Sequence, residues 1–241
     1  MSEHHHKETF ITKYIFSQDH KMIAKQFLIT GMFMAIIGML MSAIFRVQLA
    51  NPGESSILYN LLPGDWINEA GALNPDKYLA LVTMHGTILV FWVLTAGLSG
   101  TFANFLIPLQ IGARDMASGF INMLSYWFFF IATVILISAI YVQGGPASGG
   151  WTIYPPLSAL PQAIPGSGTG MTLWLISITL FVVGSLLGGL NYIVTILNLR
   201  TIGMSMKRLP LTVWALLITA IIRELSIQVL ISCRLLLIFD R

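Results

Sequence analysis

The sequence predicts an all-α fold, a polytopic bundle of transmembrane helices with five helices in this chain. Of its 241 residues, 56% are hydrophobic and only 10% are charged, so a soluble domain could not bury this much apolar surface. Five long apolar runs also occur along the chain, and each approaches or exceeds the roughly 20 residues that cross a bilayer. Lipid is therefore the expected solvent for most of the chain.

Each apolar run predicts one membrane-spanning helix. The expected spans cover residues 27–49, 78–109, 119–141, 171–197 and 212–239. Residues 1–26 form a polar N-terminal segment, and residues 27–241 form a single membrane domain without a linker or a second soluble domain. The second and fifth spans are longer than a perpendicular helix requires, so we expect them to tilt.

The lysines and arginines predict how these helices are oriented. With the N-terminus in the cytoplasm, only Lys77 and Arg241 lie clearly outside. The basic residues inside are then Lys7, Lys13, Lys21, Lys25, Arg114, Arg200, Lys207 and Arg208. They are spread over several segments and form no basic patch, so nucleic acid is not an expected partner.

Two further features concern packing between the spans. The segment 142–170 becomes external in this orientation, and because it is long and carries no charge, we expect it to pack against the rest of the molecule. The small-residue pairs Gly184 with Gly188 and Ala96 with Gly100 predict close contacts between helices.

The cysteine and histidine content limits the possible cofactor chemistry. Cys233 is the single cysteine, so no internal disulfide forms, and no Cys-x-x-Cys-His motif exists to attach a c-type haem. Metal chemistry must therefore depend on histidine or carboxylate. The histidines His4, His5 and His6 belong to a polar tail rather than to a metal site, and this tail lacks the apolar core of a signal peptide.

His85 is the residue most expected to carry chemistry. It lies about seven residues into the second span, roughly 10 Å below the outer surface at ~1.5 Å per residue. A polar group without a partner is costly at that depth, so it is a functional candidate by default. A neutral imidazole commonly ligates a metal, and the small residues Thr83, Gly86 and Thr87 leave room for a flat macrocycle. The alternative is an imidazole hydrogen-bonded to a neighbouring helix.

Arg46 is a second candidate, at a similar depth near the outer end of the first span. One interpretation is an arginine that extends its charged end to the interface. The other is a contact with an anionic or carbonyl group of a bound cofactor. The similar depth of His85 favours the second interpretation slightly.

Asp115 lies in the inner loop after the second span. It is either a loop carboxylate paired with Arg114 or the start of a polar route into the bundle. Polar side chains that can face one another on three spans favour such a route; they are Asn104, Asn122, Ser185 and Asn191. Amides and hydroxyls in a bundle hold waters, and a chain of waters can move protons.

Six sequence blocks occur in the order found in a known family. They are Asp19-His-Lys-Met22, Thr83-Met-His85-Gly-Thr87, Asn104-Phe-Leu-Ile-Pro108, Ile111-Gly-Ala-Arg-Asp115-Met-Ala117, Gly150-Trp-Thr-Ile-Tyr-Pro-Pro-Leu157 and Leu190-Asn-Tyr-Ile-Val-Thr195. In these blocks the chain resembles the haem-copper oxidase family, specifically subunit I of the cytochrome c oxidase type in a bacterial form. The similarity extends from about His20 to Arg241.

The resemblance implies a role for each candidate residue. His85 would be one axial ligand of a low-spin haem, and Arg46 would contact the periphery of that haem. Trp151 and Tyr154 would belong to an external segment that covers the haem. Asp115 would be the entrance of a proton-uptake route from the cytoplasm, with Asn104, Asn122, Ser185 and Asn191 along it.

The resemblance also implies what this chain lacks. The family has about twelve helices, so we expect this chain to be an N-terminal part that contains no catalytic residue and cannot reduce oxygen alone. A second axial histidine, copper and the second haem belong to the complete subunit. The implied partners are the remaining helices of subunit I, oxidase subunits II and III, a cytochrome c or quinol donor, and the lipid of a bacterial inner membrane.

The fifth span departs from the family pattern, which is apolar there. Its interrupting polar residues are Arg223, Glu224, Gln228 and Arg234. Arg223 and Glu224 are sequence neighbours that point in different directions, so we do not expect them to pair well. The polar residues either contact another subunit or mark the degenerate end of a gene fragment.

The leading hypothesis is the N-terminal part of the catalytic subunit of a terminal respiratory oxidase. In the complete enzyme, electron transfer to oxygen would be coupled to proton translocation. One alternative is a transporter or channel without redox chemistry that uses His85, Arg46 and Asp115 as a proton or ion path. Another is a truncated fragment without function.

Overall fold

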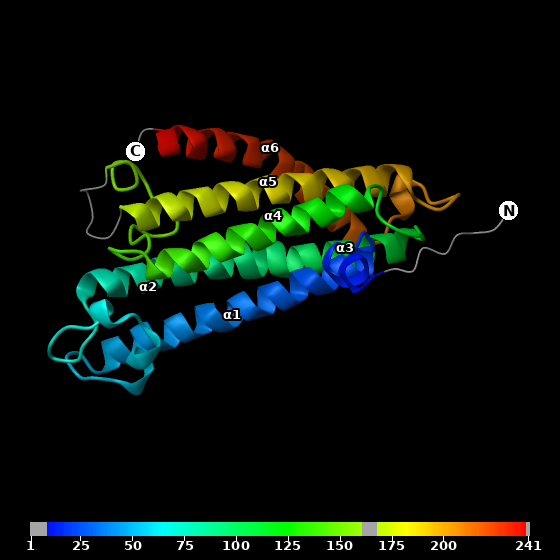
Figure 1. Cartoon of the computed structure of the whole chain (residues 1–241). Helices are drawn as coiled ribbons and strands as arrows, with labels where there is room; N and C mark the ends of the chain where they lie inside the picture. The colour runs from blue at the N-terminus through cyan, green and yellow to red at the C-terminus, as the bar shows by residue number, and fades with distance from the viewer. Residues whose placement is uncertain (1–8, 161–167, 240–241) are drawn as a thin grey trace.

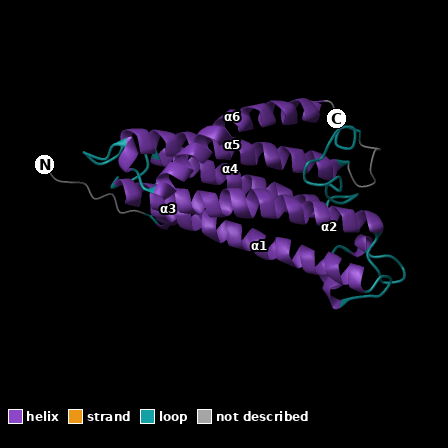
Figure 2. Ribbon diagram, turned by 180° about the vertical axis from the view of Figure 1, so that it is seen from behind, coloured by secondary structure: helices purple, strands orange, loops and turns teal. Residues whose placement is uncertain are grey.

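Five long helical spans lie side by side in the computed structural model of the chain, which describes residues 9–160 and 168–239 (Figure 1). They are α1 (His20–Ala50), the composite second span from α2 (Pro75–Thr87) to α3 (Ser99–Ile111), α4 (Gly119–Ser138), α5 (Thr169–Asn198) and α6 (Leu211–Phe239). Helices and loops, without a strand, make up the described ranges (Figure 2). All five spans are long and apolar enough to cross a membrane. The prediction of an all-α polytopic membrane protein is confirmed.

The spans begin and end near their predicted positions, and capping explains the largest difference. α1 begins at His20 rather than at residue 27, because the Asp19 carboxylate accepts a hydrogen bond from Lys21 N (3.2 Å) and caps the helix. α2 begins at Pro75, whose fixed backbone angle suits the first helical turn. Gly112, with a φ of 72°, ends the second span.

The middle of the second span departs from α-helical geometry, which the sequence analysis does not predict. Residues Ile88–Leu98 form a π-helix, in which Thr95 Oγ1 donates to the Val90 carbonyl oxygen (2.7 Å). Gly97 in this stretch meets Gly31 of α1 so closely that a Cβ on Gly31 would lie 2.7 Å from Gly97 Cα. This crossing of two backbones fixes how α1 lies against the second span.

Close contacts at the predicted small residues are confirmed. A Cβ on Gly184 of α5 would lie 2.8 Å from the Ser125 carbonyl oxygen of α4. A Cβ on Gly100 of α3 would lie 2.8 Å from the Phe27 ring of α1. These glycines therefore let α5 approach α4 and let α3 approach α1.

The segment after α4 packs against the bundle, as its lack of charge predicts. Ala147 and Ile153 are buried, and Gly150 N donates to Thr83 Oγ1 of α2 (2.9 Å). Residues 161–167 of the predicted external segment lie outside the described residues. The segment is thus held over the C-terminal end of α2, which contains His85.

The loop between α1 and α2 is packed onto the same end of the molecule. Tyr59 and Trp66 are buried, and the Tyr59 hydroxyl donates to Gln48 Oε1 of α1 (2.7 Å). Burial raises the pKa of the Tyr59 phenol above its ordinary value, so this hydroxyl stays protonated and keeps donating at neutral pH.

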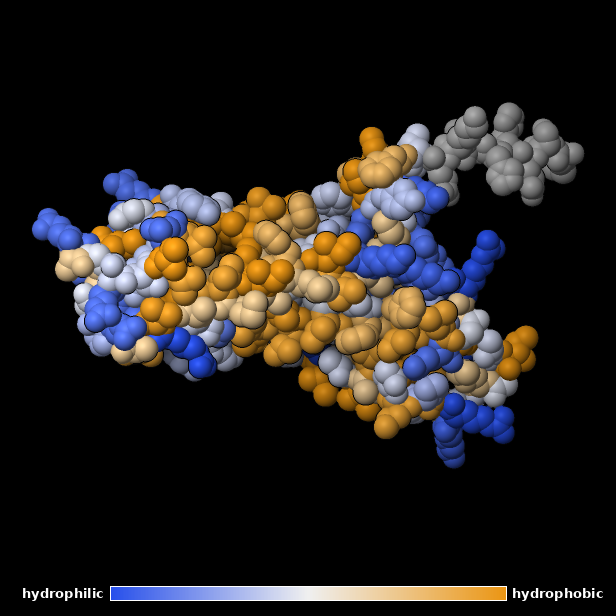
Figure 3. All heavy atoms as spheres, turned by 90° about the horizontal axis from the view of Figure 1, so that it is seen from below, coloured by the Kyte–Doolittle hydropathy of each residue, from blue (hydrophilic) through white to orange (hydrophobic). Residues whose placement is uncertain are grey.

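The outside of the bundle suits a lipid environment. In the face that Figure 3 draws, hydrophobic side chains form a band between hydrophilic ends. Exposed apolar side chains include Ile29 and Met32 on α1 and Ile222 and Leu225 on α6. α6 is the most exposed of the five spans, because it lies along the outside of α5 (Figure 1).

The Gly31 crossing can be tested by substitution. We expect Gly31→Leu to destabilise the bundle by about 1–3 kcal/mol, because a side chain has no space against the Gly97 backbone. Thermal unfolding in detergent, followed by circular dichroism, measures this. Gly64→Ala is the control, since a Cβ there meets no atom within 4 Å. An unchanged midpoint for Gly31→Leu would contradict the tight crossing.

Candidate functional site

The imidazole of His85 has one partnered and one free nitrogen. Its Nδ1 donates to the Gly38 carbonyl oxygen of α1 (2.8 Å), and the side chain is half-buried near the end of α2. Its Nε2 makes no hydrogen bond to any residue in the described ranges. A hydrogen bond of this kind at one nitrogen fixes the tautomer and leaves the other nitrogen as a lone-pair donor.

The surroundings of His85 fit a haem ligand. The Phe45 ring of α1 meets the imidazole edge to face, with ring centroids 5.4 Å apart, and fixes its plane. Gly86, the next residue, has no side chain, and a Cβ there would meet the Trp151 ring at 3.6 Å. The oriented imidazole, its free Nε2 and the aromatic ring beside the neighbouring glycine therefore suit an axial ligand under a planar group.

The other two residues assigned to the haem region are less constrained. Arg46 is exposed and makes no hydrogen bond or ion pair with a described residue. It directly follows Phe45, so it lies one residue from a side chain that contacts His85. Tyr154 is 70% exposed and lines a groove with residues of α6, Leu230 and Arg234 among them. The structure thus brings Trp151 against Gly86, the residue after His85, whereas no hydrogen bond joins Arg46 or Tyr154 to His85 among the described residues.

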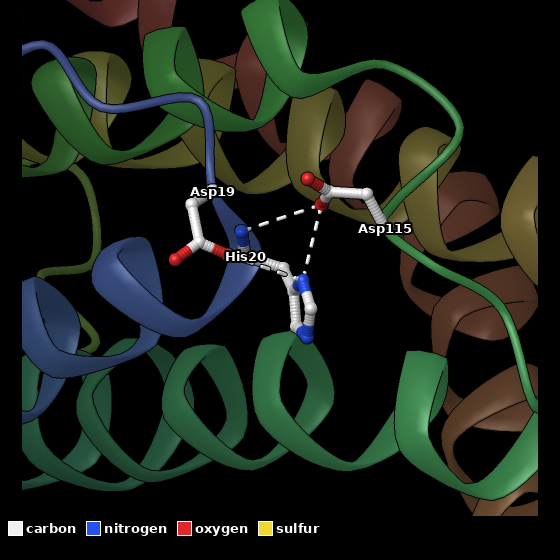
Figure 4. Close-up of side chains that lie close together, drawn as sticks. All are labelled: Asp19, His20 and Asp115. Carbon is white, nitrogen blue, oxygen red and sulfur yellow. Dashed lines mark hydrogen bonds and ion pairs between the residues drawn. The ribbon is translucent and has the colours of Figure 1, made fainter. Parts of the chain in front are cut away.

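Asp115 lies beside His20 at the opposite end of the bundle (Figure 4). Asp115 Oδ1 accepts hydrogen bonds from Met116 N (2.7 Å) and His20 N (3.3 Å), and it lies 3.2 Å from His20 Nδ1. Among the described residues no ion pair joins Asp115 to Arg114, so the pairing considered above is wrong. Arg114 and Asp115 lie in a loop that directs the Asp115 carboxylate toward the start of α1.

His20 is a site residue that the sequence analysis missed. It is 3% exposed, although it precedes the predicted start of the first span. Its Nδ1 lies between Asp115 and Asp19, and its Nε2 is buried without a hydrogen-bond partner in the described part of the chain. The ligand atoms of the three residues lie within 4.8 Å of one another, a spacing that a divalent cation tolerates. The signal in the sequence is the Asp19-His-Lys-Met22 block, where an N-cap precedes a histidine.

Asn191 and Thr195 of α5 hold the chain that follows Asp115. Asn191 Oδ1 accepts from Ser118 N (3.0 Å), and Asn191 Nδ2 donates to the Ser118 carbonyl oxygen (3.1 Å). Thr195 Oγ1 accepts from Ala117 N (2.9 Å). Asn191 therefore clamps the N-cap of α4, a structural role that the sequence analysis does not predict.

The interior beyond this clamp contains polar atoms without partners. Asn122 is fully buried, and neither Nδ2 nor Oδ1 makes a hydrogen bond to any of the described residues. Asn104 is also fully buried; its Nδ2 donates to the Tyr192 hydroxyl (3.0 Å), while its Oδ1 has no partner. Three unpartnered amide atoms in an apolar interior are costly unless water binds them.

A cavity of about 20 Å³ lies deeper, between α3, α4 and α5. Its lining includes the hydroxyl-bearing residues Thr95, Ser125, Ser185 and Tyr192, and Gly184 and Gly188 leave the space. This volume holds about one water. Ser125 donates to the Asn122 backbone carbonyl oxygen (2.7 Å) and Tyr192 accepts from the Asn104 amide, so one hydrogen bond links each asparagine to a residue of the cavity wall.

The charges of α6 lie partly inside the bundle. Arg223 lines the same cavity with its guanidinium carbon 5.9 Å from the Tyr192 ring. Arg223 Nε and Nη2 and Glu224 Oε1 are buried without hydrogen-bond partners, and no ion pair joins the two residues in the described ranges. The expectation that the two side chains point in different directions is wrong, because both reach Gly189 of α5, where a Cβ would meet Glu224 Oε1 and would lie 2.6 Å from Arg223 Nη2. Gln228 is exposed.

Comparison with known proteins finds a single family along nearly the whole chain. The family described as "Cytochrome C and Quinol oxidase polypeptide I" matches residues 22–241. The alternative cytochrome c oxidase subunit 1 of Bradyrhizobium diazoefficiens is 41% identical over 99% of this chain and 38% of the relative. Cytochrome c oxidase subunit 1 of Candida albicans is 38% identical over 97% of this chain and 40% of the relative.

A third relative matches this chain with a similar identity and coverage. Cytochrome c oxidase subunit 1 of Thermostichus vulcanus is 37% identical over 94% of this chain and 37% of the relative. This chain thus spans well under half the length of the relatives that it matches. The match over nearly all of its residues, across bacterial and fungal proteins, shows that the chain belongs to the cytochrome c and quinol oxidase polypeptide I family.

Proposed function

We propose that this chain forms the N-terminal part of the catalytic subunit of a terminal respiratory oxidase. The observation that carries the proposal is the His85 imidazole, whose Nδ1 is bound to the Gly38 carbonyl and whose Nε2 is free. This arrangement lies in a chain of the oxidase polypeptide I family. In the complete protein, electrons would pass to oxygen, coupled to proton translocation.

His85 would hold a low-spin haem through Nε2. When bound, the haem supplies a one-electron redox centre. The Gly38 carbonyl keeps the proton on Nδ1 and makes the imidazole a stronger donor. Phe45 fixes the ring plane, Trp151 covers the adjacent face and excludes water, and Arg46 would bind an anionic group at the haem edge. Copper, a second haem and a further protein ligand for this haem would come with the complete subunit.

Asp115 would take up protons from the cytoplasm. The half-buried Asp115 carboxylate and the buried His20 imidazole next to it would exchange a proton at this end of the bundle. The unpartnered amide atoms of Asn104 and Asn122 support bound water beyond it. The cavity at Ser185 would hold the next water, so protons would move inward along hydrogen-bonded waters.

The orientation and partners follow from the same proposal. Residues 1–26 would face the cytoplasm of a bacterium, and the spans would cross its inner membrane. The remaining helices of subunit I would complete the bundle, with subunits II and III around it. Either a cytochrome c or a quinol would donate the electrons.

The haem ligand can be tested by spectroscopy of the complete subunit. We expect a dithionite-reduced sample to show a low-spin α-band that His85→Leu abolishes, because the leucine removes the ligand nitrogen. His20→Leu is the matched control, since it removes a buried imidazole at the other end and should keep the band. A protein without any Soret band would favour the alternative, a transporter without redox chemistry.

The proton entrance can be tested by carboxylate replacement. We expect Asp115→Asn to slow proton uptake in reconstituted vesicles by roughly 10²-fold, because the amide cannot exchange a proton. Electron input and the haem spectrum should stay unchanged. Asp76→Asn, an exposed carboxylate at the opposite end, is the control. Equal rates for Asp115→Asn and the unmodified protein would refute this assignment.

The interior waters can be tested at Asn122. We expect Asn122→Leu to change thermal stability little, since it removes two unsatisfied buried atoms, yet to slow proton uptake. Proton uptake and the unfolding midpoint are measured on the same preparation. Strong destabilisation together with normal uptake would show that Asn122 has a structural role instead.

A further inference from the structure

Arg223 and Glu224 of α6 place two opposite charges against the same residue of α5. Both side chains reach Gly189, where a Cβ would contact Glu224 Oε1 and would lie 2.6 Å from Arg223 Nη2. Because Gly189 has no side chain, it leaves room for both charged ends. No ion pair joins the two residues in the described part of the chain, so the cation and the carboxylate lie close together without direct contact.

Arg223 also lines the interior cavity of about 20 Å³. Each of the five spans contributes to the lining of this cavity, from Phe27 of α1 to Arg223 of α6, so the cavity is internal whatever packs around α6. Arg223 Nε and Nη2 are buried and have no hydrogen-bond partner among the described residues. A water in the cavity would accept from these donors. The cavity therefore combines space for one water with a guanidinium in its wall.

Tyr192 connects this cavity with the polar route that begins at Asp115. Its hydroxyl accepts from Asn104 Nδ2 (3.0 Å), and its ring centre lies 5.9 Å from the guanidinium carbon of Arg223. A phenol that accepts from an amide keeps its own O–H for another acceptor, and Tyr192 lines the cavity. A proton that moves inward past Asn104 would therefore arrive beside Arg223.

A fixed positive charge in the wall of such a cavity opposes the arrival of a proton. Arginine stays protonated in proteins, and like charges repel more strongly where little water surrounds them. Arginine side chains in narrow water-filled pores exclude protons for this reason. A carboxylate next to the arginine reduces the repulsion, and Glu224 is placed to do so.

We propose that Arg223 sets the slowest step of inward proton transfer and that Glu224 lowers this barrier by offsetting the charge of Arg223. The inference rests on the proposed proton route from Asp115 and names the residues that limit its rate. It also gives a role to two of the charges that interrupt the fifth span, since both act on the interior of the bundle. Neither residue has to carry the proton itself.

Proton uptake by the complete subunit in reconstituted vesicles tests the proposal with two neutralising variants. We expect Arg223→Met to speed uptake at least roughly fivefold, the effect of removing one unit charge at about 4 Å even in the dielectric of bulk water. Glu224→Gln should slow uptake by a similar factor, because the offsetting negative charge is lost. A purely structural role would change both rates in the same direction.

Two further variants serve as controls. Arg223→Lys keeps the charge and should stay within about twofold of the unmodified rate. Arg234→Met removes another buried cation of α6, which faces the Trp174 ring at 4.9 Å and is not among the described residues that line the cavity. It should leave uptake unchanged. Unfolding midpoints identify any variant that does not fold, and the nearly isosteric Glu224→Gln keeps the test valid if Arg223→Met fails to fold.

Unchanged or slower uptake in a folded Arg223→Met, or unchanged or faster uptake in Glu224→Gln, would overturn the proposal. Asp115→Asn in the same vesicles separates this result from the proposed route. If Asp115→Asn does not slow uptake, the route fails and the inference fails with it. If Asp115→Asn slows uptake while the two neutralising variants do not act in opposite directions, the inference alone is overturned.

Discussion

The rest of this structure depends on one constraint: a polar group inside a lipid-embedded bundle needs a partner within the protein, or within something the protein binds. Most polar side chains satisfy it locally. The hydroxyls of Thr87 and Thr133, for example, donate to backbone carbonyls of their own helices, and the hydroxyl of Ser177 on α5 donates to a backbone carbonyl of α4. Among the described residues, the buried atoms of His20, Asn104 and Asn122 that lack a partner lie where a function is proposed, whereas others, such as Gln26 Oε1 and Trp127 Nε1, do not.

His85 shows how the constraint can produce a site. One nitrogen satisfies it by donating to Gly38, and that bond leaves the other nitrogen oriented and free. The contact requires α1 to pass close to α2, which the backbone crossing of Gly31 and Gly97 permits. At the opposite end, the cap of α1 brings His20 to Asp115. Packing glycines and a helix cap therefore position both halves of the proposed electron and proton machinery.

The sequence predicted the fold well because apolar runs of spanning length have few alternatives in a membrane. It also made His85 a functional candidate from its depth in the second span, and the role of His85 stays a prediction. It could not predict the burial of His20, since that depends on where the loop of Asp115 folds back. The π-helical stretch at Ile88–Leu98 and the clamp by Asn191 on Ser118 arise from contacts between distant segments. The pattern of apolar residues along the sequence does not reveal such contacts.

The central claim is that His85 Nε2 is a haem ligand oriented by the Gly38 carbonyl. A cryo-electron microscopy map of the complete subunit in lipid nanodiscs tests it most directly. The account predicts a macrocycle whose iron lies at bonding distance from His85 Nε2, with Nδ1 still bound to Gly38. A map in which Nε2 contacts water or protein, with the macrocycle ligated elsewhere or absent, would contradict it.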